Sequence, residues 1–221
     1  MRAQPNHNEA RRLKVLWQYE VLDTVPEEVF DDLTELAARI CEAPIALISL
    51  VDEDRQWFKS KVGLTIKETS RDISFCGHAI QQDDLFIVPD ATKDLRFARN
   101  PLVTSDPKIR FYAGAPLITP DGHALGSLCV IDKVPRELRP EQMQALRVLA
   151  RHVMTQLELR RHARELTAAQ TAREAVTDEL AKARLEVEKL RQQVSVLKVK
   201  KAVRKVVSAR RTVRRARAKA R

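Results

Sequence analysis

The chain has 221 residues, of which 44% are hydrophobic and 32% are charged, and its formal net charge is +10. This length allows one sizeable domain with an appendage or two small domains, and the charged fraction indicates long exposed helices. Residues 198 to 221 hold twelve Lys and Arg and no Asp or Glu, which leaves 28 basic against 30 acidic residues before them. The basicity is therefore confined to the C-terminal tail.

The three cysteines, Cys41, Cys76 and Cys129, are too few and too scattered for a disulfide framework. Each lies among apolar residues, which is typical of reduced thiols in a cytoplasmic protein. Residues 1 to 13 are polar and do not resemble a signal peptide. The longest apolar run, residues 43 to 51, has about half the length of a membrane span and predicts a buried strand. We expect a cytoplasmic protein.

Two helices are predicted before the first strand. Residues 7 to 20 carry apolar side chains at helical spacing and predict a leading amphipathic helix. Asp23, Thr24 and Pro26, followed by two acids, predict the start of a second helix, which ends before Pro44.

The middle of the chain predicts hairpins, with turns at Asp-Glu-Asp and Pro-Asp-Gly. Residues 91 to 107 show little periodicity and predict a long loop, and the chain after Pro135 predicts helix. Hairpin-connected strands between helices favour an α+β fold, an antiparallel sheet packed by helices on one face. The predicted strands are residues 45 to 52, 55 to 63, 86 to 90, 109 to 119 and 123 to 132.

The chain contains, in this order, the stretches LDTVPEEVFDDLTELAARIC, PIALISLVDEDRQWFKS, SFCGHAI, VPDATKDLRFARNPLV and IRFYAGAPLITPDGHALGSLCVID. Together they resemble a GAF domain of bacterial signalling proteins, of the subgroup found ahead of histidine kinases and diguanylate cyclases. The resulting organisation is an N-terminal helix (1–20), a GAF sensor domain (21–157), a parallel coiled coil (158–197) and a basic tail (198–221).

Cys76 and His78 stand two positions apart in the third stretch. On a helix, such side chains point about 200° away from each other, so they cannot grip one metal ion or form a nucleophile–base pair. Ser74 can cap this helix and place Cys76 in its first turn, where a thiolate is favoured. Two interpretations stay open: a reactive thiol, or a small buried hydrophobe beside a hydrogen-bonded histidine.

No enzyme motif is present: the five glycines form no phosphate-binding loop, and there is no Gly-x-Ser-x-Gly or zinc motif. Bilin-binding GAF domains usually carry histidine directly after the attachment cysteine, whereas Gly77 follows Cys76 here. The GAF-type methionine sulfoxide reductases do not match around the cysteines, and the NKFDE-type signature of cyclic-nucleotide GAF domains is absent. The resemblance implies a non-catalytic sensor and identifies no cofactor.

GAF domains hold ligands between the sheet and the segments that cross its face, and the resemblance implies the matching positions here. Arg96, Arg99 and Asn100 could pair with an anionic group. The alternative is that Arg96 and Asp90 only hold their loop to the body of the domain. The implied ligand-binding residues are Cys76, His78, Asp90, Arg96, Phe97, Asn100, Arg110 and Tyr112.

A seven-residue repeat runs from 159 to 197, and the residues of its second half favour a parallel dimer over a single solvated helix. In that dimer Glu179 faces Arg184 and Glu186 faces Arg191, and these pairs select the register. The a positions are Leu159, Leu166, Arg173, Leu180, Val187 and Val194, and the d positions are His162, Ala169, Val176, Ala183, Leu190 and Leu197.

The tail contains no aromatic residue, so we expect any nucleic acid to be bound without sequence preference. The other candidate partners of the tail are an anionic membrane surface and an acidic protein. The expected anion-binding residues are Lys200, Lys201, Arg204, Lys205, Arg210, Arg211, Arg214, Arg215 and Arg217.

Two classes of function follow from these features. The first is a sensory or regulatory module that binds a small ligand or a partner protein, forms a homodimer, and signals to a histidine kinase or cyclase. The second is an architectural protein that binds nucleic acid through its tail and uses the GAF fold as a dimer platform. A small molecule retained on purification would favour the first class, and a well-packed empty interior would favour the second.

Overall fold

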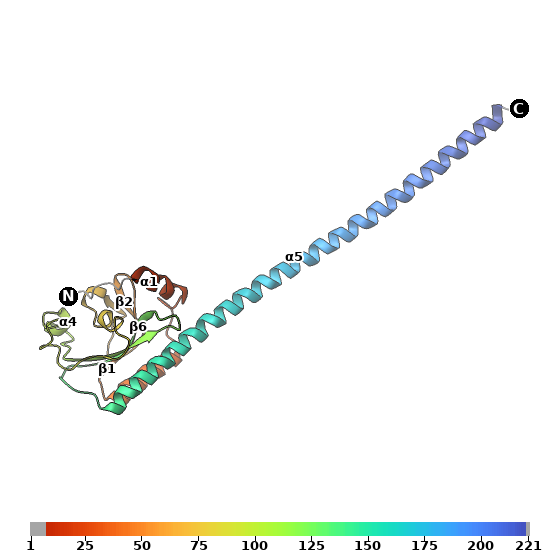
Figure 1. The fold of residues 1–221 in the computed structure, drawn as a ribbon. Coiled ribbons are helices and arrows are strands. Elements are labelled where there is room, and N and C mark those ends of the chain that lie inside the picture. Colours follow the sequence, from red (N-terminus) through yellow and green to blue (C-terminus); the bar gives the residue numbers. More distant parts are fainter. Residues whose placement is uncertain (1–7, 220–221) are drawn as a thin grey trace. The chain divides into compact units, whose positions relative to one another are not determined.

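The computed structural model describes residues 8 to 219, and it describes their side chains as far as residue 210. The chain divides into two compact units, Met1–Ala163 and Arg164–Arg221. The first unit contains a six-stranded sheet, and the second is the C-terminal part of one helix, α5 (Figure 1). The helices are α1 (Glu9–Gln18), α2 (Glu28–Cys41), α3 (Cys76–Ala79), α4 (Pro101–Thr104) and α5 (Pro140–Lys219), with a 3-10 turn at Arg71–Ile73.

The strands lie in the order β3-β2-β1-β6-β5-β4, and every neighbouring pair is antiparallel. Opposite residues of an antiparallel pair face the same side of the sheet. Leu47 of β1 and Gly114 of β5 both lie opposite Cys129 of β6, and Ser49 lies opposite Ser127. The strands are β1 (Ile45–Val51), β2 (Arg55–Val62), β3 (Glu68–Ser70), β4 (Phe86–Val88), β5 (Phe111–Ile118) and β6 (Ala124–Asp132).

Both faces of the sheet are covered. On the first face, α1, α2 and the start of α5 pack on the strands, with Phe30 and Leu157 among the buried side chains. On the second face, α3, α4 and the loops beside them build a separate core around Phe75 and Phe97. The expectation that helices cover only one face was wrong. Since β1 is buried at all seven of its positions, its alternate side chains need a core on each side.

The predicted helices and hairpins are confirmed with three local differences. The second helix begins at Glu28 without a side-chain cap, because Thr24 donates its hydroxyl to the carbonyl of Val21 instead. The expected loop contains α4, whose first turn Asn100 caps. The third difference is β3, an edge strand of three residues that pairs with β2.

The second unit is helical as far as Lys219. From Leu166 to Val207 its large apolar side chains are exposed, among them Leu180, Leu190 and Val194. Within the described range 8 to 219, no helix has the length and apolar character that a membrane crossing needs.

Candidate functional site

The second face of the sheet carries a cluster of stacked aromatic rings. The rings of Phe75 and Phe97 stack at 4.0 Å between centroids, and Tyr112 lies 5.2 Å from Phe75. His78 packs edge-on against Phe97 at 4.9 Å and lies 6.2 Å from Phe86. Phe75, Phe97 and Tyr112 are fully buried. This cluster fills the space between the sheet and the segments that cross it.

Beneath the rings lies a buried cluster of sulfur and hydroxyl groups. The sulfur of Cys76, from α3, lies 3.9 Å from that of Cys129, from β6. The hydroxyl of Tyr112 donates to the sulfur of Cys76 at 3.4 Å and lies 3.2 Å from the hydroxyl of Ser127. The nearby Ser49 hydroxyl has no hydrogen-bond partner among the described residues. The sheet therefore places two thiols and three hydroxyls in one apolar core.

The position of the Tyr112 hydroxyl depends on Gly114. Tyr112 and Gly114 lie two residues apart on β5 and face the same side, so the tyrosine ring can lie across the glycine. A methyl group at Gly114 would overlap the end of that ring. Because Gly114 lies opposite Cys129, the tyrosine hydroxyl is brought to the two sulfurs. Ser74 Oγ accepts from the amide of Gly77 at 2.9 Å, which confirms the expected cap and sets the start of α3.

The two thiols differ in acidity. Hydrogen bonds from the Cys129 thiol and the Tyr112 hydroxyl favour the thiolate of Cys76 and lower its pKa, although burial opposes this. The hydrogen bond to Cys76, together with burial, raises the pKa of Cys129 well above its usual range. The pair therefore holds its remaining proton on Cys129. Cys41 lies in the core of the first face, where burial raises its pKa to about 11.

A cavity of about 40 Å³ adjoins this cluster. Its lining is apolar apart from Cys76, Tyr112, Gln56 and Thr69. The Thr69 hydroxyl is buried and has no hydrogen-bond partner among the described residues. Cavities that hold drug-sized ligands measure about 300 Å³ or more. This second-face cavity thus has room for a water-sized molecule and not for a nucleotide or a tetrapyrrole.

Of the eight implied ligand residues, Cys76, His78, Phe97 and Tyr112 come together on the second face. Cys76 faces Cys129 while His78 packs on Phe97, so the two side chains diverge as the helical spacing predicted.

The other four implied residues hold the loops in place. Asn100 accepts from the amide of Leu102 and donates to the carbonyl of Ile73. Arg96 pairs with Asp94 at 2.5 Å and lies over the ring of Phe86. Asp90 accepts from Thr92 and pairs with Lys93, and Arg110 donates to the carbonyl groups of Val103 and Ile109.

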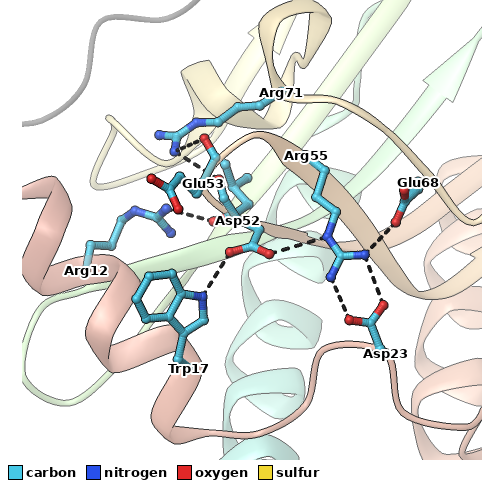
Figure 2. Close-up of polar contacts among 9 residues, drawn as sticks. Arg12, Trp17, Asp23, Asp52, Glu53, Arg55, Glu68 and Arg71 are labelled. Atoms are coloured by element: carbon cyan, nitrogen blue, oxygen red, sulfur yellow. Dashed lines mark hydrogen bonds and ion pairs between the residues drawn. The ribbon is translucent and has the colours of Figure 1, made fainter.

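A second polar cluster, the N-terminal clamp, consists of Glu9, Arg12, Trp17, Asp52 and Arg71. The carboxylate of Glu9 pairs with Arg12 and with Arg71, each at 2.7 Å. Arg71 also donates to the carbonyl of Asp52, whose carboxylate accepts from the indole of Trp17 at 3.0 Å (Figure 2). Both arginines are buried. The clamp therefore ties α1 to the β1–β2 turn and to the segment after β3.

Arg55 extends this network on the more exposed side, and Figure 2 shows the carboxylates that surround it. It pairs with Asp23 at 2.6 Å, with Glu68 at 2.7 Å and with Asp52 at 3.3 Å. Asp23 belongs to the link between α1 and α2, and Glu68 opens β3. A single guanidinium group thus holds three segments that are distant in sequence.

In the tail, the five expected anion-binding residues with described side chains are exposed, namely Lys200, Lys201, Arg204, Lys205 and Arg210. The side chains of Arg211, Arg214, Arg215 and Arg217 lie outside the described residues. Within the described range, no group of three His, Cys, Asp or Glu could hold a metal ion.

Sequence reasoning missed Cys129, Ser127 and Ser49 as members of the cluster around Cys76. The available signal was that Ser127 and Cys129 alternate on one side of a strand. That alternation does not reveal which residue of another segment lies above them, because the pairing depends on strand register and on the position of α3.

Comparison with known proteins identifies the family. A family model described as GAF domain matches residues 25 to 157. The fold is similar to that of two solved GAF domains. That of an Acinetobacter phosphoenolpyruvate-protein phosphotransferase is 18% identical, with a TM-score of 0.51 over 69% of this chain and 94% of that one. The PixJ GAF domain of Thermosynechococcus elongatus is 16% identical, with a TM-score of 0.53 over 75% and 95% of the two chains.

Because the family model covers more than half of its length, the chain belongs to the GAF domain family, whose members are typically regulatory modules. A Pseudomonas aeruginosa protein named cyclic di-GMP phosphodiesterase PA2567 is 47% identical over 141 residues, which is 63% of this chain. The matched region is 24% of that protein, so this chain spans about a quarter of its relative's length.

Proposed function

We propose that the protein is a non-catalytic regulatory module in bacterial signal transduction, which forms a parallel homodimer through residues 159 to 197. The observation that carries this proposal is a GAF domain followed by a helix with exposed apolar side chains at heptad spacing. The buried site residues of the second face pack and hydrogen-bond with one another. This arrangement supports a regulatory role more than a catalytic one.

The exposed side chains support dimerisation. On the single helix, Leu180 is 50%, Val187 49%, Leu190 54% and Val194 48% exposed. All four stand at a or d positions, so they form one continuous apolar stripe. Soluble proteins rarely leave a contiguous apolar patch of this kind uncovered. A second copy of the same helix covers the stripe completely and also aligns Glu186 with Arg191 of the partner.

The test compares two leucines of similar exposure on the same helix. Leu190, at a d position, is 54% exposed, and Leu185, at an outward f position, is 59% exposed. In sedimentation equilibrium, Leu190→Ala should weaken the dimer about tenfold or more, because it removes a seam side chain. Leu185→Ala should leave the dissociation constant within about twofold. A wild-type chain that is monomeric at micromolar concentration would refute the proposal, as would equal effects of the two substitutions.

Two kinds of input are proposed for this module. Of the eight residues named above, Cys76 and Tyr112 line the second-face cavity and would contact a small ligand, with His78 and Phe97 packed beside them. The exposed loop around Arg96 would contact a partner protein such as a histidine kinase or cyclase. The second-face cavity limits the size of the small ligand. At about 40 Å³ it admits only a molecule of about the size of water, and a larger ligand requires the aromatic rings to move apart. Native mass spectrometry of the purified chain tests the first input together with the dimer, because it reports retained ligand and subunit number.

The basic tail supports the alternative, an architectural protein that binds nucleic acid. The described basic side chains between 198 and 210 are exposed and lie close together in the sequence. If about six of them meet phosphates, the affinity for random-sequence duplex DNA should fall with salt at a log–log slope near −5 per tail. A chain truncated before Lys198 should lose this binding. Preference for anionic lipid vesicles over DNA at equal salt would instead favour a membrane surface.

A further inference from the structure

The Cys76–Cys129 pair has the geometry of two thiols that can be joined. Their sulfurs lie 3.9 Å apart, and a disulfide bond measures about 2.0 Å. Cys76 is at the start of the short helix α3, whereas Cys129 is fixed in the central strand β6. The gap can close through the Cys76 side chain and the short helix that carries it, while Cys129 stays in the sheet. We propose that Cys76 and Cys129 are a peroxide-responsive thiol pair that converts to an intramolecular disulfide.

The second-face cavity supplies the access that such a pair needs. Cys76 is part of its lining, and Ile66, which also lines it, is 46% exposed, so the cavity reaches close to the surface. A cavity needs roughly 10–15 Å³ to hold a water molecule. At about 40 Å³ this one has room for hydrogen peroxide, which is little larger than water. The Thr69 hydroxyl in the lining offers a hydrogen bond to the bound molecule.

The reaction balances with hydrogen peroxide as the only oxidant. The thiolate of Cys76 attacks one peroxide oxygen and the O–O bond breaks; the hydroxide released takes a proton to become water, and Cys76 becomes a sulfenic acid. The sulfur of Cys129 then attacks the sulfur of Cys76, and the departing hydroxide takes the proton of Cys129. Two thiols and one peroxide thus give one disulfide and two water molecules.

The surrounding groups suit this order of events. The Tyr112 hydroxyl donates to the sulfur of Cys76 at 3.4 Å, which stabilises the attacking thiolate and makes Tyr112 a positioning residue. Cys129 keeps its proton and lies within reach as the resolving thiol. The disulfide would shift α3 towards β6 beneath the rings of Phe75 and Phe97. The reaction does not depend on the coiled coil, and only its use as a signal rests on the proposed function.

The experiment uses the full chain and hydrogen peroxide. After timed exposure, the protein is denatured, alkylated with N-ethylmaleimide and mapped by mass spectrometry. We expect a product that has lost two hydrogen atoms and carries one N-ethylmaleimide group, on Cys41, where the reduced chain carries three. Its peptide map should contain a linked Cys76–Cys129 peptide. Cys76 should react at least about tenfold faster than Cys41 in the same molecule. Equal rates at Cys76 and Cys41, or oxidation of Cys76 without a link to Cys129, would overturn the proposal.

Variants separate the steps. Cys129→Ser should stop at a sulfenic acid on Cys76 that dimedone traps, whereas Cys41→Ser should behave as the wild type.

The oxidation rate of the wild type should rise with pH to a plateau above the pKa of Cys76, about 6. Tyr112→Phe should move that midpoint upward, which a merely structural loss would not do, and an unchanged midpoint would contradict the role of Tyr112. If Cys129→Ser does not fold, the wild-type peptide map still decides the proposal. Sedimentation after oxidation tests the dimer separately, so each proposal can fail alone.

Discussion

Glu9 of the N-terminal clamp gives the sharpest test of how the domain is held together. Burial disfavours its charged form, but hydrogen bonds and charges from Arg12 and Arg71 prevail and lower the pKa of Glu9 from 4.5 to about 2. At 1.36 kcal/mol for each pKa unit, this shift corresponds to an upper value of about 3 kcal/mol. Since the side chain is 16% exposed, solvent screening reduces the expected loss in Glu9→Gln to about 2 kcal/mol at pH 7.

The pH dependence of this effect has a defined sign. The pKa of Glu9 is lower in the folded state, so its contribution is complete above about pH 4.5, the ordinary value, and is lost as the pH falls towards 2. The difference in free energy of unfolding between wild type and Glu9→Gln should therefore shrink over that interval. It should stay constant between pH 5 and 7.

Urea unfolding followed by circular dichroism measures both quantities, and Glu35→Gln is the matched control. Glu35 pairs with Arg39 on the same helix face at 2.5 Å, but the two side chains are 53% and 75% exposed. Loss of this pair should cost less than about 0.5 kcal/mol. The reasoning would be refuted if Glu9→Gln cost no more than Glu35→Gln, or if the difference from wild type grew as the pH fell.

Three further substitutions test the packing and the seam. Gly114→Ala should destabilise the domain by about 1–3 kcal/mol in urea unfolding, because its methyl group meets the Tyr112 ring, and a loss below about 0.5 kcal/mol would contradict that overlap. Leu157→Ala, at a side chain 1% exposed, should cost about 2–5 kcal/mol, whereas Leu185→Ala should leave the domain unchanged. Arg173→Leu should tighten the dimer measured by sedimentation, because it removes a charge from the seam. Lys182→Leu, at an outward c position, should leave the dissociation constant of the dimer unchanged. Equal effects of the two substitutions would place the seam elsewhere.

Most elements of the fold could be predicted from local pattern. The apolar run of β1 and the hairpin turns indicated the sheet, because strand length, hydrophobicity and turn chemistry are properties of neighbouring residues. Two short elements were missed. β3, at Glu68–Ser70, has three polar residues and exists only because β2 offers a free edge, and α4 depends on the cap by Asn100.

The candidate site was less predictable. Its first residue, Cys76, stood out in the sequence, but its partner Cys129 is 53 positions away and looked like an ordinary strand residue. The same holds for Glu9 at the start of α1, whose partner Arg71 lies far along the chain, directly after β3. Charge and hydrophobicity of single residues cannot indicate such pairs, because they depend on register and on how the segments cross the sheet.

The sequence by itself determined the family, the sheet of hairpins, the heptad repeat and the position of the basic tail. These properties follow from the order and spacing of residue types along the chain. The tertiary structure alone decided that helices cover both faces, that Tyr112 reaches two sulfurs across Gly114, and that the second-face cavity is small. The physical reason is that volume and hydrogen-bond geometry arise only when segments distant in sequence pack against each other.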